Sequence, residues 1–139
     1  MARADRFTDS TVKSQIYSDF LTDLNRHPVS GDVVRFTNEN AVIRSIKNLL
    51  GTNKGERFYQ PDIGSNVRHM LFELMGTGTS EEIISLVRET ISKHEPRAKI
   101  IDIQVIGDEE NHRYVISLTV LILNQQDPVT FSVSLNRVR

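Results

Sequence analysis

The chain has no cysteine and no tryptophan, and only 6% of its residues are aromatic. Without cysteine it can form neither disulfide bonds nor a thiolate nucleophile nor a thiolate zinc site. The low aromatic content argues against a surface on which nucleic-acid bases stack. Seventeen basic and eighteen acidic residues leave a net charge of −1. No general electrostatic attraction therefore draws the chain to nucleic acid or to an anionic membrane.

Long apolar runs are missing as well. The longest run, from Val120 to Leu123, has the length of a strand, whereas a bilayer span needs about 20 apolar residues. Residues 1–10 contain two arginines with no apolar stretch after them, which does not fit a signal peptide. We expect a protein that acts where it is made, or inside an assembly built there, with neither nucleic acid nor membrane as a partner.

The length of 139 residues fits a single domain that buries a modest core without disulfides or metal. Residues 1–14 are polar and show no hydrophobic period, so we expect a flexible N-terminal arm there. The single domain then occupies residues 15–139.

The first part of this domain predicts a short helix, a turn and a brief strand. Apolar residues recur at the four-residue spacing of one helix face, at Ile16, Phe20 and Leu24. Proline and glycine within residues 27–32 indicate a turn. Residues 33–36 suggest a strand that could join the main sheet.

Two further helices follow. Residues 39–50 predict the first long helix, with Asn38 as its N-cap. Its apolar stripe has the spacing i, i+4, i+7, i+8, at Val42, Ile46, Leu49 and Leu50. The next helix opens at Ser65 or Asn66 and ends before Gly76, with an apolar face formed by Val67, Leu71 and Leu74.

The last predicted helix starts at a capping-box pattern. In this pattern Thr79 and Glu82 can satisfy each other's backbone N–H groups. The apolar stripe that follows consists of Ile83, Val87 and Ile91. The helix has to stop before Pro96, because proline disfavours helical geometry in the residue that precedes it.

From residue 97 onward the hydrophobic period changes from 3.6 to 2, which predicts an antiparallel meander. Ile101, Ile103 and Val105 share one face of the first strand. The inward face of the next strand consists of Tyr114, Ile116, Leu118, Val120 and Ile122. In the last strand polar residues alternate with Val129, Phe131, Val133 and Leu135. Leu121 and Leu123 predict that the middle strand ends covered on both faces. Helices followed by strands predict an α+β domain, with about three helices packed on an antiparallel sheet of three to four strands.

No motif for metal, cofactor or covalent catalysis stands out. The histidines lie in separate predicted elements without a metal-ligand spacing, at His27, His69, His94 and His112. Gly76-Thr77-Gly78 lacks the Gly-Lys-Ser/Thr ending of a phosphate loop. Because Gly-x-Ser-x-Gly is also absent, we expect no cofactor, no metal and no catalytic nucleophile.

Several short motifs follow one another in a familiar order. They are Ala41 to Leu50 (AVIRSIKNLL), Gly55-Glu56-Arg57, Pro61 with Gly64, Leu71-Phe72-Glu73, and Glu95-Pro96-Arg97 immediately before the strands. From about Tyr17 to the C-terminus, this order resembles the baseplate wedge and sheath-initiator family of contractile-tailed phages. Relatives of that family occur in type VI secretion systems.

The resemblance implies a domain like the core domain of the tail-sheath protein, with a structural and non-catalytic role in the virion tail baseplate. Its implied partners are the tail-sheath protein and other baseplate wedge subunits, in multiple copies within a symmetric ring assembled in the host bacterial cytoplasm. The family's Glu-Pro-Arg triplet, matched here by Glu95, Pro96 and Arg97, docks on the helical core bundle of the wedge. The resemblance also implies that the sheet of this chain accepts strands from the first sheath ring.

The triplet has a chemical interpretation of its own. Pro96 fixes φ and breaks the helix, so the carboxylate of Glu95 and the guanidinium of Arg97 are held at a sharp corner. A guanidinium there can bind a carboxylate or the helix-end carbonyls of a partner through two parallel hydrogen bonds. The alternative is a helix stop flanked by two solvated charges.

The last predicted strand lacks charge and proline, the usual features of a protected sheet edge. An unprotected edge is a template for strand addition from another chain, and we expect that edge at Val129, Thr130, Phe131, Ser132, Val133, Ser134 and Leu135. The alternative is a strand paired on both sides within its own domain.

Two other features leave alternatives open. The loop of Gly55-Glu56-Arg57 can be structural or a site, and we favour a structural loop. Basic residues can form a docking patch or solvated faces, at Arg44, Lys47, Lys54, Arg57 and Arg68.

Some members of the family carry a lysozyme-like label, which makes a peptidoglycan hydrolase the rival function. Such an enzyme needs two carboxyl groups across a sugar-binding cleft. The candidates are Glu73, Glu81, Glu82 and Glu95. We favour an assembly subunit, because each of these carboxyls has a structural explanation and no tryptophan is present as a sugar platform. A third possibility is an adaptor domain with a different partner.

Overall fold

A computed structural model describes residues 16–20, 24–123 and 125–136, and the arm predicted for residues 1–14 lies outside this part of the chain. The elements in chain order are β1 (Ser18–Phe20), β2 (Arg35–Thr37), α1 (Glu39–Gly51), α2 (Val67–Met70), α3 (Thr77–His94), β3 (Ala98–Asp108), β4 (Arg113–Ile122) and β5 (Val129–Asn136). Helices followed by an antiparallel meander confirm the α+β fold. No helix in the described residues is long and apolar enough to cross a membrane.

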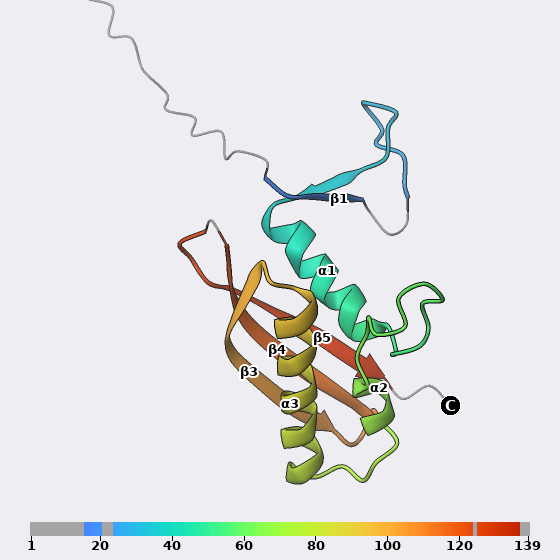
Figure 1. Cartoon of the computed structure of the whole chain (residues 1–139), viewed down its shortest axis with the longest axis vertical. Coiled ribbons are helices and arrows are strands. Elements are labelled where there is room, and N and C mark those ends of the chain that lie inside the picture. The colour runs from blue at the N-terminus through green and yellow to red at the C-terminus, as the bar shows by residue number, and fades with distance from the viewer. Residues whose placement is uncertain (1–15, 21–23, 124, 137–139) are drawn as a thin grey trace, which may run out of the picture.

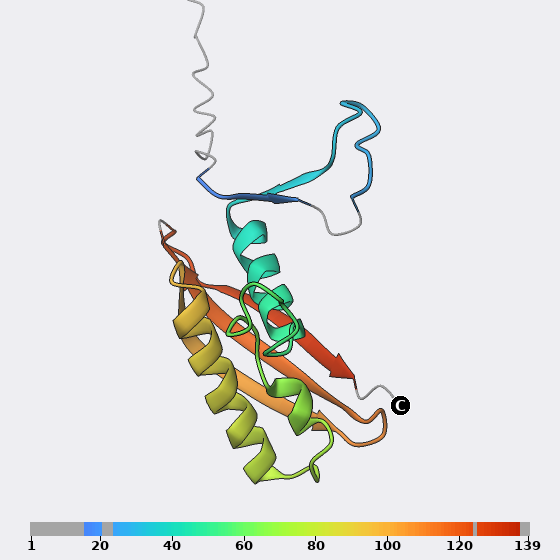
Figure 2. The same ribbon diagram turned by 45° about the vertical axis from the view of Figure 1, so that its right-hand side comes forward.

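Two layers form the body of the molecule. The strands β3, β4 and β5 make an antiparallel sheet in that order, and α1 and α3 lie across one of its faces (Figures 1 and 2). The middle strand has every second residue fully inside: Tyr114, Ile116, Leu118, Val120 and Ile122. They pack against the apolar stripes of the two helices, Val42, Ile46 and Leu50 from α1 and Ile83, Val87 and Ile91 from α3. Burial of this one apolar face holds the helices on the sheet.

The predicted N-terminal helix is wrong, because β1 is a strand that pairs with β2 in a separate two-stranded ribbon. The Oδ1 atom of Asn38 accepts hydrogen bonds from the backbone N–H groups of Ile16 and Tyr17, at 3.0 and 3.4 Å. Asn38 is therefore used to hold β1 and makes no side-chain cap on α1. Figure 1 shows the ribbon beyond the N-terminal end of α1, away from the main sheet that the strand at residues 33–36 was expected to join.

The second predicted helix is a single turn. Val67 and Leu71 are buried as expected, but Leu74 is 90% exposed and contributes nothing to the core. The predicted capping box is also wrong, since α3 begins at Thr77 and the Thr79 hydroxyl donates to the Leu74 carbonyl oxygen at 2.7 Å. The N-cap residue of α3 is Gly76, which has no side chain that could cap the helix.

A β-bulge changes which residues of β3 face the core. Ile100 pairs with Val120 and Asp102 with Thr119, which leaves Ile101 unpaired and 55% exposed. One inserted residue reverses the alternation that follows it. The expectation that Ile101 shares one strand face with Ile103 and Val105 is therefore wrong, because Ile103 is buried.

The predicted covering of both faces at the end of β4 is also wrong. Leu123 is 55% exposed, and both long helices lie on the opposite face of the sheet (Figure 2). The outer face carries a mixture of Ser, Thr and aliphatic side chains along β4, as expected for an antiparallel sheet with one solvated face.

Candidate functional site

A buried carboxylate lies where α3 ends. Glu95 follows the last helical residue, its backbone N–H donates to the Ile91 carbonyl, and the next residue, Pro96, prevents another turn. Its side chain is only 3% exposed. The Arg97 Nε atom lies 2.5 Å from Oε1, Nη2 lies 2.8 Å from Oε2, and the Ser45 hydroxyl donates to Oε2 at 2.5 Å. The two predicted charges are therefore brought together within the chain.

These contacts shift the acidity of both groups. Burial raises the pKa of Glu95, but the hydrogen bonds from Arg97 and Ser45 outweigh burial and leave the pKa below its ordinary value. The hydrogen bond to Glu95 raises the pKa of Arg97. The corner is a charged pair at neutral pH, in which Glu95 fixes the direction of the guanidinium.

Arg97 connects this corner to the N-terminal ribbon. Its guanidinium carbon lies 5.3 Å from the centre of the Tyr17 ring, within the range of a cation–π contact. Glu95 takes two of the five guanidinium donors, and the Arg97 side chain is still 37% exposed. A partner approaching the corner would meet the guanidinium, while the carboxylate lies behind it.

A groove of about 370 Å³ adjoins the corner, lined by Asp19, Ser45, Asn48, Leu49, Arg57, Ile63 and His94. Ser45 belongs both to this groove and to the Glu95 site. The groove brings Arg57 of the predicted Gly-Glu-Arg motif to the same surface as the end of α3. Polar side chains with a few aliphatic ones suit a protein contact better than a small apolar ligand.

The loop that carries Arg57 is closed by its own hydrogen bonds. Glu56 accepts from the backbone N–H of Asn53 at 2.8 Å and from its side-chain amide at 3.1 Å. Gly64 has φ +135, and a Cβ atom there would lie 2.7 Å from the Thr52 carbonyl oxygen. Ser65, fully buried, donates to the Leu50 carbonyl oxygen. These contacts give the Gly55-Glu56-Arg57 motif a structural role in closing the loop, and the closed loop places Arg57 at the groove.

The other candidate surface is the outer side of β5. In the described residues β5 pairs only with β4, from Arg113↔Asn136 to Val120↔Val129. The opposite edge, β3, carries the bulge at Ile101 with Lys99 and Asp102 beside it. Bulges and charges are the devices that protect an edge strand, and β5 has neither. Both end strands lack a second neighbour in the described residues, and β5 is the one that carries neither a bulge nor a charge.

The remaining candidates stay apart. No group of three potential metal ligands occurs in the described residues. Two of the basic candidates lie over aromatic rings, Arg44 over the Phe36 ring at 5.1 Å and Lys47 over the Phe131 ring at 5.8 Å. Arg57 faces the groove. Ser45 and Tyr17 were not anticipated as site residues, because each meets Glu95 or Arg97 across a long stretch of sequence.

Comparison with known proteins identifies the family. The family model described as baseplate wedge protein gp25 matches residues 37–128. Baseplate wedge protein gp25 of Enterobacteria phage T4 is 21% identical over 116 residues, which cover 84% of this chain and 87% of that protein. A chain in the baseplate of the anti-feeding prophage superposes with a TM-score of 0.68 and 26% identity, over 80% of this chain and 89% of that one.

A Geobacter sulfurreducens protein named as a tail lysozyme has the same fold, with a TM-score of 0.66 and 24% identity, over 73% of this chain and 92% of that one. The family model spans both the Glu95–Arg97 corner and the two strands before β5. The chain belongs to the family of baseplate wedge protein gp25 of contractile tails.

Proposed function

We propose that the chain is a non-catalytic wedge subunit that joins the baseplate of a contractile tail to the first ring of sheath subunits. It docks on other wedge subunits through Glu95, Pro96 and Arg97, and it accepts sheath strands along β5. Several copies act together in a symmetric ring of the virion tail baseplate, assembled in the host bacterial cytoplasm. The edge at β5 carries neither a bulge nor a charge, whereas the opposite edge at β3 carries both, and this difference is the observation that carries the proposal.

Strand addition at β5 uses main-chain groups. In an antiparallel strand alternate residues direct their N–H and C=O groups away from the paired neighbour, so residues 129–136 offer such groups along their length. About four new bonds at about 0.5–1.5 kcal/mol each contribute about 2–6 kcal/mol. This is weak for one contact but sufficient where many contacts close together in a ring.

The register of the added strand would be inherited from the subunit. The side chains of Thr130, Ser132 and Ser134 are exposed, whereas Val129, Phe131 and Val133 lie partly against the core. An incoming strand whose apolar and polar residues also alternate can pair with its apolar side chains on the helix-covered face. A shift of the register by one residue would place them on the solvated face instead. The subunit can thereby set the register that later rings copy.

Docking on the wedge is assigned to the guanidinium of Arg97 and the adjoining groove. The buried carboxylate of Glu95 holds the guanidinium in place before the partner arrives, which lowers the ordering cost of binding. We expect the partner to offer a carboxylate or helix-end carbonyl oxygens to Arg97. A helix lying along the groove would reach Asn48, Arg57 and His94.

Changing a single β5 residue tests the sheath contact. Ser132→Pro removes one backbone donor and blocks strand addition, whereas Ser132→Lys keeps the backbone and introduces the charge that protects natural edges. Both should abolish sheath polymerisation on purified baseplates, seen by electron microscopy, and Ser132→Ala should not. Far-UV circular dichroism establishes that each variant is folded. Normal sheath tubes on baseplates containing folded Ser132→Lys and Ser132→Pro would refute the β5 assignment.

The hydrolase alternative is motivated by the name of the Geobacter relative. A general acid of this kind needs a raised pKa, whereas Glu95 is buried in an ion pair that lowers its pKa. Glu73, Glu81 and Glu82 are exposed. Clearing of purified cell walls by the protein, lost on Glu73→Gln or Glu95→Gln, would favour the enzyme over the structural subunit.

A further inference from the structure

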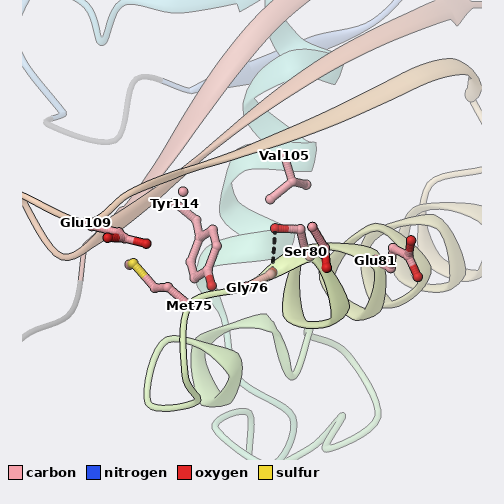
Figure 3. Close-up of a pocket in the computed structure, with 9 residues that line it drawn as sticks. Met75, Gly76, Ser80, Glu81, Val105, Glu109 and Tyr114 are labelled. Carbon is pink, nitrogen blue, oxygen red and sulfur yellow. Dashed lines mark hydrogen bonds between the residues drawn. The ribbon is translucent and has the colours of Figure 1, made fainter.

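A pocket of about 400 Å³ lies where the start of α3 faces the β3–β4 hairpin (Figure 3). Figure 3 shows its two carboxylates, Glu81 and Glu109, on opposite sides of the Tyr114 ring, with Glu81 directed away from the ring. The Ser80 hydroxyl is used within α3, where it donates to the Gly76 carbonyl oxygen at 3.2 Å. Because these polar groups do not converge on one ligand, they define no binding site.

A different arrangement is found along β5, where a cation of the helix layer lies above the edge strand. In Figure 1 α1 lies toward β5 and α3 toward β3. The side of α1 that faces α3 is marked by Ser45, which donates a hydrogen bond to Glu95 at the end of α3. At 3.6 residues per turn Lys47 lies about 200° around the helix from Ser45. Its Nζ atom is 5.8 Å from the centre of the Phe131 ring of β5, so Lys47 lies on the β5 side of the helix layer.

The ammonium of Lys47 is the charge that dominates the middle of this edge. The side chain is exposed, and no carboxylate among the residues that the structure describes forms an ion pair with it. Arg44, about one turn earlier on α1, lies over Phe36 of the ribbon instead. The strand itself carries no charge from Val129 to Asn136. Lys47 therefore adds an unbalanced positive charge beside β5.

We propose that Lys47 selects a sheath strand that carries an aspartate or a glutamate directly opposite Phe131, an inference that rests on the proposed strand addition at β5. Side chains directly opposite each other on paired strands have Cβ atoms about 5 Å apart and point to the same face. Phe131 lies partly against the core, on the helix-covered face, so the side chain opposite it points toward α1. A carboxylate at that place can reach the Lys47 ammonium and accept a charge-assisted hydrogen bond from it.

This charge restricts the register of the added strand more narrowly than alternation does. A shift by two residues returns every side chain to the same face, so alternation alone does not distinguish such registers. The same shift moves an acidic side chain about 7 Å along β5, away from the Lys47 ammonium. Lys47 therefore favours one register among those that alternation allows.

A second copy of this chain is the occupant of the edge that Lys47 disfavours. Antiparallel pairing of two β5 strands about a two-fold axis keeps both helix layers on the same face of the joined sheet. The two Lys47 ammoniums then lie along the same seam, where like charges on opposite strands destabilise the pairing. The lysine thus favours an acidic strand over self-association of the subunit.

A strand tethered to the C-terminus tests this preference in the full-length chain. A flexible Gly-Ser linker after Arg139 carries an added strand of about eight residues, in which Thr and Val alternate and one central Val is replaced by Glu, Gln or Lys. Protection of the β5 amides from hydrogen exchange, measured by NMR, reports docking of the added strand. We expect docking to weaken about two- to fivefold from Glu to Gln, and again from Gln to Lys. In the Lys47→Glu variant the order should reverse.

Lys93→Glu is the matched control, because it makes the same change of charge at an exposed position on α3, which lies over β3. The strand with Glu should remain the preferred one in this control. Equal protection by all three added strands would overturn the role of Lys47, while strand addition at β5 would stand. If no added strand protected β5, strand addition itself would be refuted, and this inference with it.

The natural partner gives a second, independent test. In a map of the intact tail, the residue of the sheath strand opposite Phe131 should be an aspartate or a glutamate. A neutral or basic residue there would overturn the selection by Lys47 and leave strand addition intact. A second copy of this chain paired along β5 would overturn both.

Discussion

Replacing Glu95 by glutamine keeps the shape of the side chain and removes its charge. In the wild-type protein this carboxylate accepts two hydrogen bonds from Arg97 and one from Ser45, and it is 3% exposed. Glutamine has one acceptor oxygen in place of two, and its amide group faces donors. The substitution therefore weakens all three contacts without opening a cavity.

The expected loss of stability follows from these three bonds. Hydrogen bonds to a charged group contribute about 1 kcal/mol more than neutral ones, which suggests about 3 kcal/mol for three. Arg97 is 37% exposed, so solvent screens part of the charge and reduces the expected loss to about 2 kcal/mol. For a domain of this size, that corresponds to a melting temperature lower by about 6 °C.

The pH dependence has a definite sign. The pKa of Glu95 in the folded protein lies below the ordinary value of 4.5, so the carboxylate contributes its full stabilisation above the pKa of the unfolded chain. This contribution is lost as the pH falls below 4.5 and through the lowered pKa of the folded state. The difference between wild type and Glu95→Gln should therefore shrink in acid.

Urea unfolding followed by far-UV circular dichroism measures this difference, at about pH 7 and again at about pH 3. Glu89→Gln is the matched control, since Glu89 is an exposed carboxyl on the same helix. It should change stability by less than about 0.5 kcal/mol. A Glu95→Gln protein as stable as wild type at neutral pH, or a loss that does not diminish in acid, would refute this account of the corner.

Two further substitutions probe the corner and the loop beside it. Arg97→Lys keeps the positive charge but cannot form two parallel hydrogen bonds, so the folded variant should bind wedge subunits at least about tenfold more weakly in pull-down titrations; unchanged affinity would contradict docking through Arg97. Gly64→Ala places a Cβ atom 2.7 Å from a backbone oxygen, whereas Gly55, also at positive φ, has open space. Gly64→Ala should cost about 2–4 kcal/mol and Gly55→Ala about 1 kcal/mol by thermal denaturation, and equal costs would contradict the close approach.

The body of the fold was predictable because its patterns are long and regular. Five alternating apolar residues from Tyr114 to Ile122 allow only a half-buried strand, and the stripe of Ile83, Val87 and Ile91 allows only a helix. Pro96 marked the end of α3 correctly. Such elements depend on local periodicity, which the burial of one face then stabilises.

The errors occur where long-range contacts decide the structure. Ile16, Phe20 and Leu24 have helical spacing, but β1 is held by Asn38 and β2, two contacts that no local pattern reveals. Ile100 and Ile101 are adjacent and alike, so the sequence does not show which of them is the extra residue of the bulge.

The candidate site was predictable only in part. The sequence identified the triplet at residues 95–97, but it did not show that the Glu95 carboxylate bonds to Arg97 and Ser45 within the chain. Ser45 lies 50 residues away from Glu95 in the chain, and only the packing of α1 beside α3 brings the two together. Strand order places β5 at one end of the sheet in the described residues, with β3 at the other end, and the use of β5 as the docking edge stays a prediction.

The most direct test is a cryo-electron microscopy map of the intact tail, at a resolution that traces the main chain around this subunit. The account predicts a strand of a sheath subunit hydrogen-bonded along residues 129–135, and a wedge partner in contact with the Arg97 guanidinium. A map in which β5 contacts no sheath strand, while sheath subunits still attach to the baseplate, would contradict it.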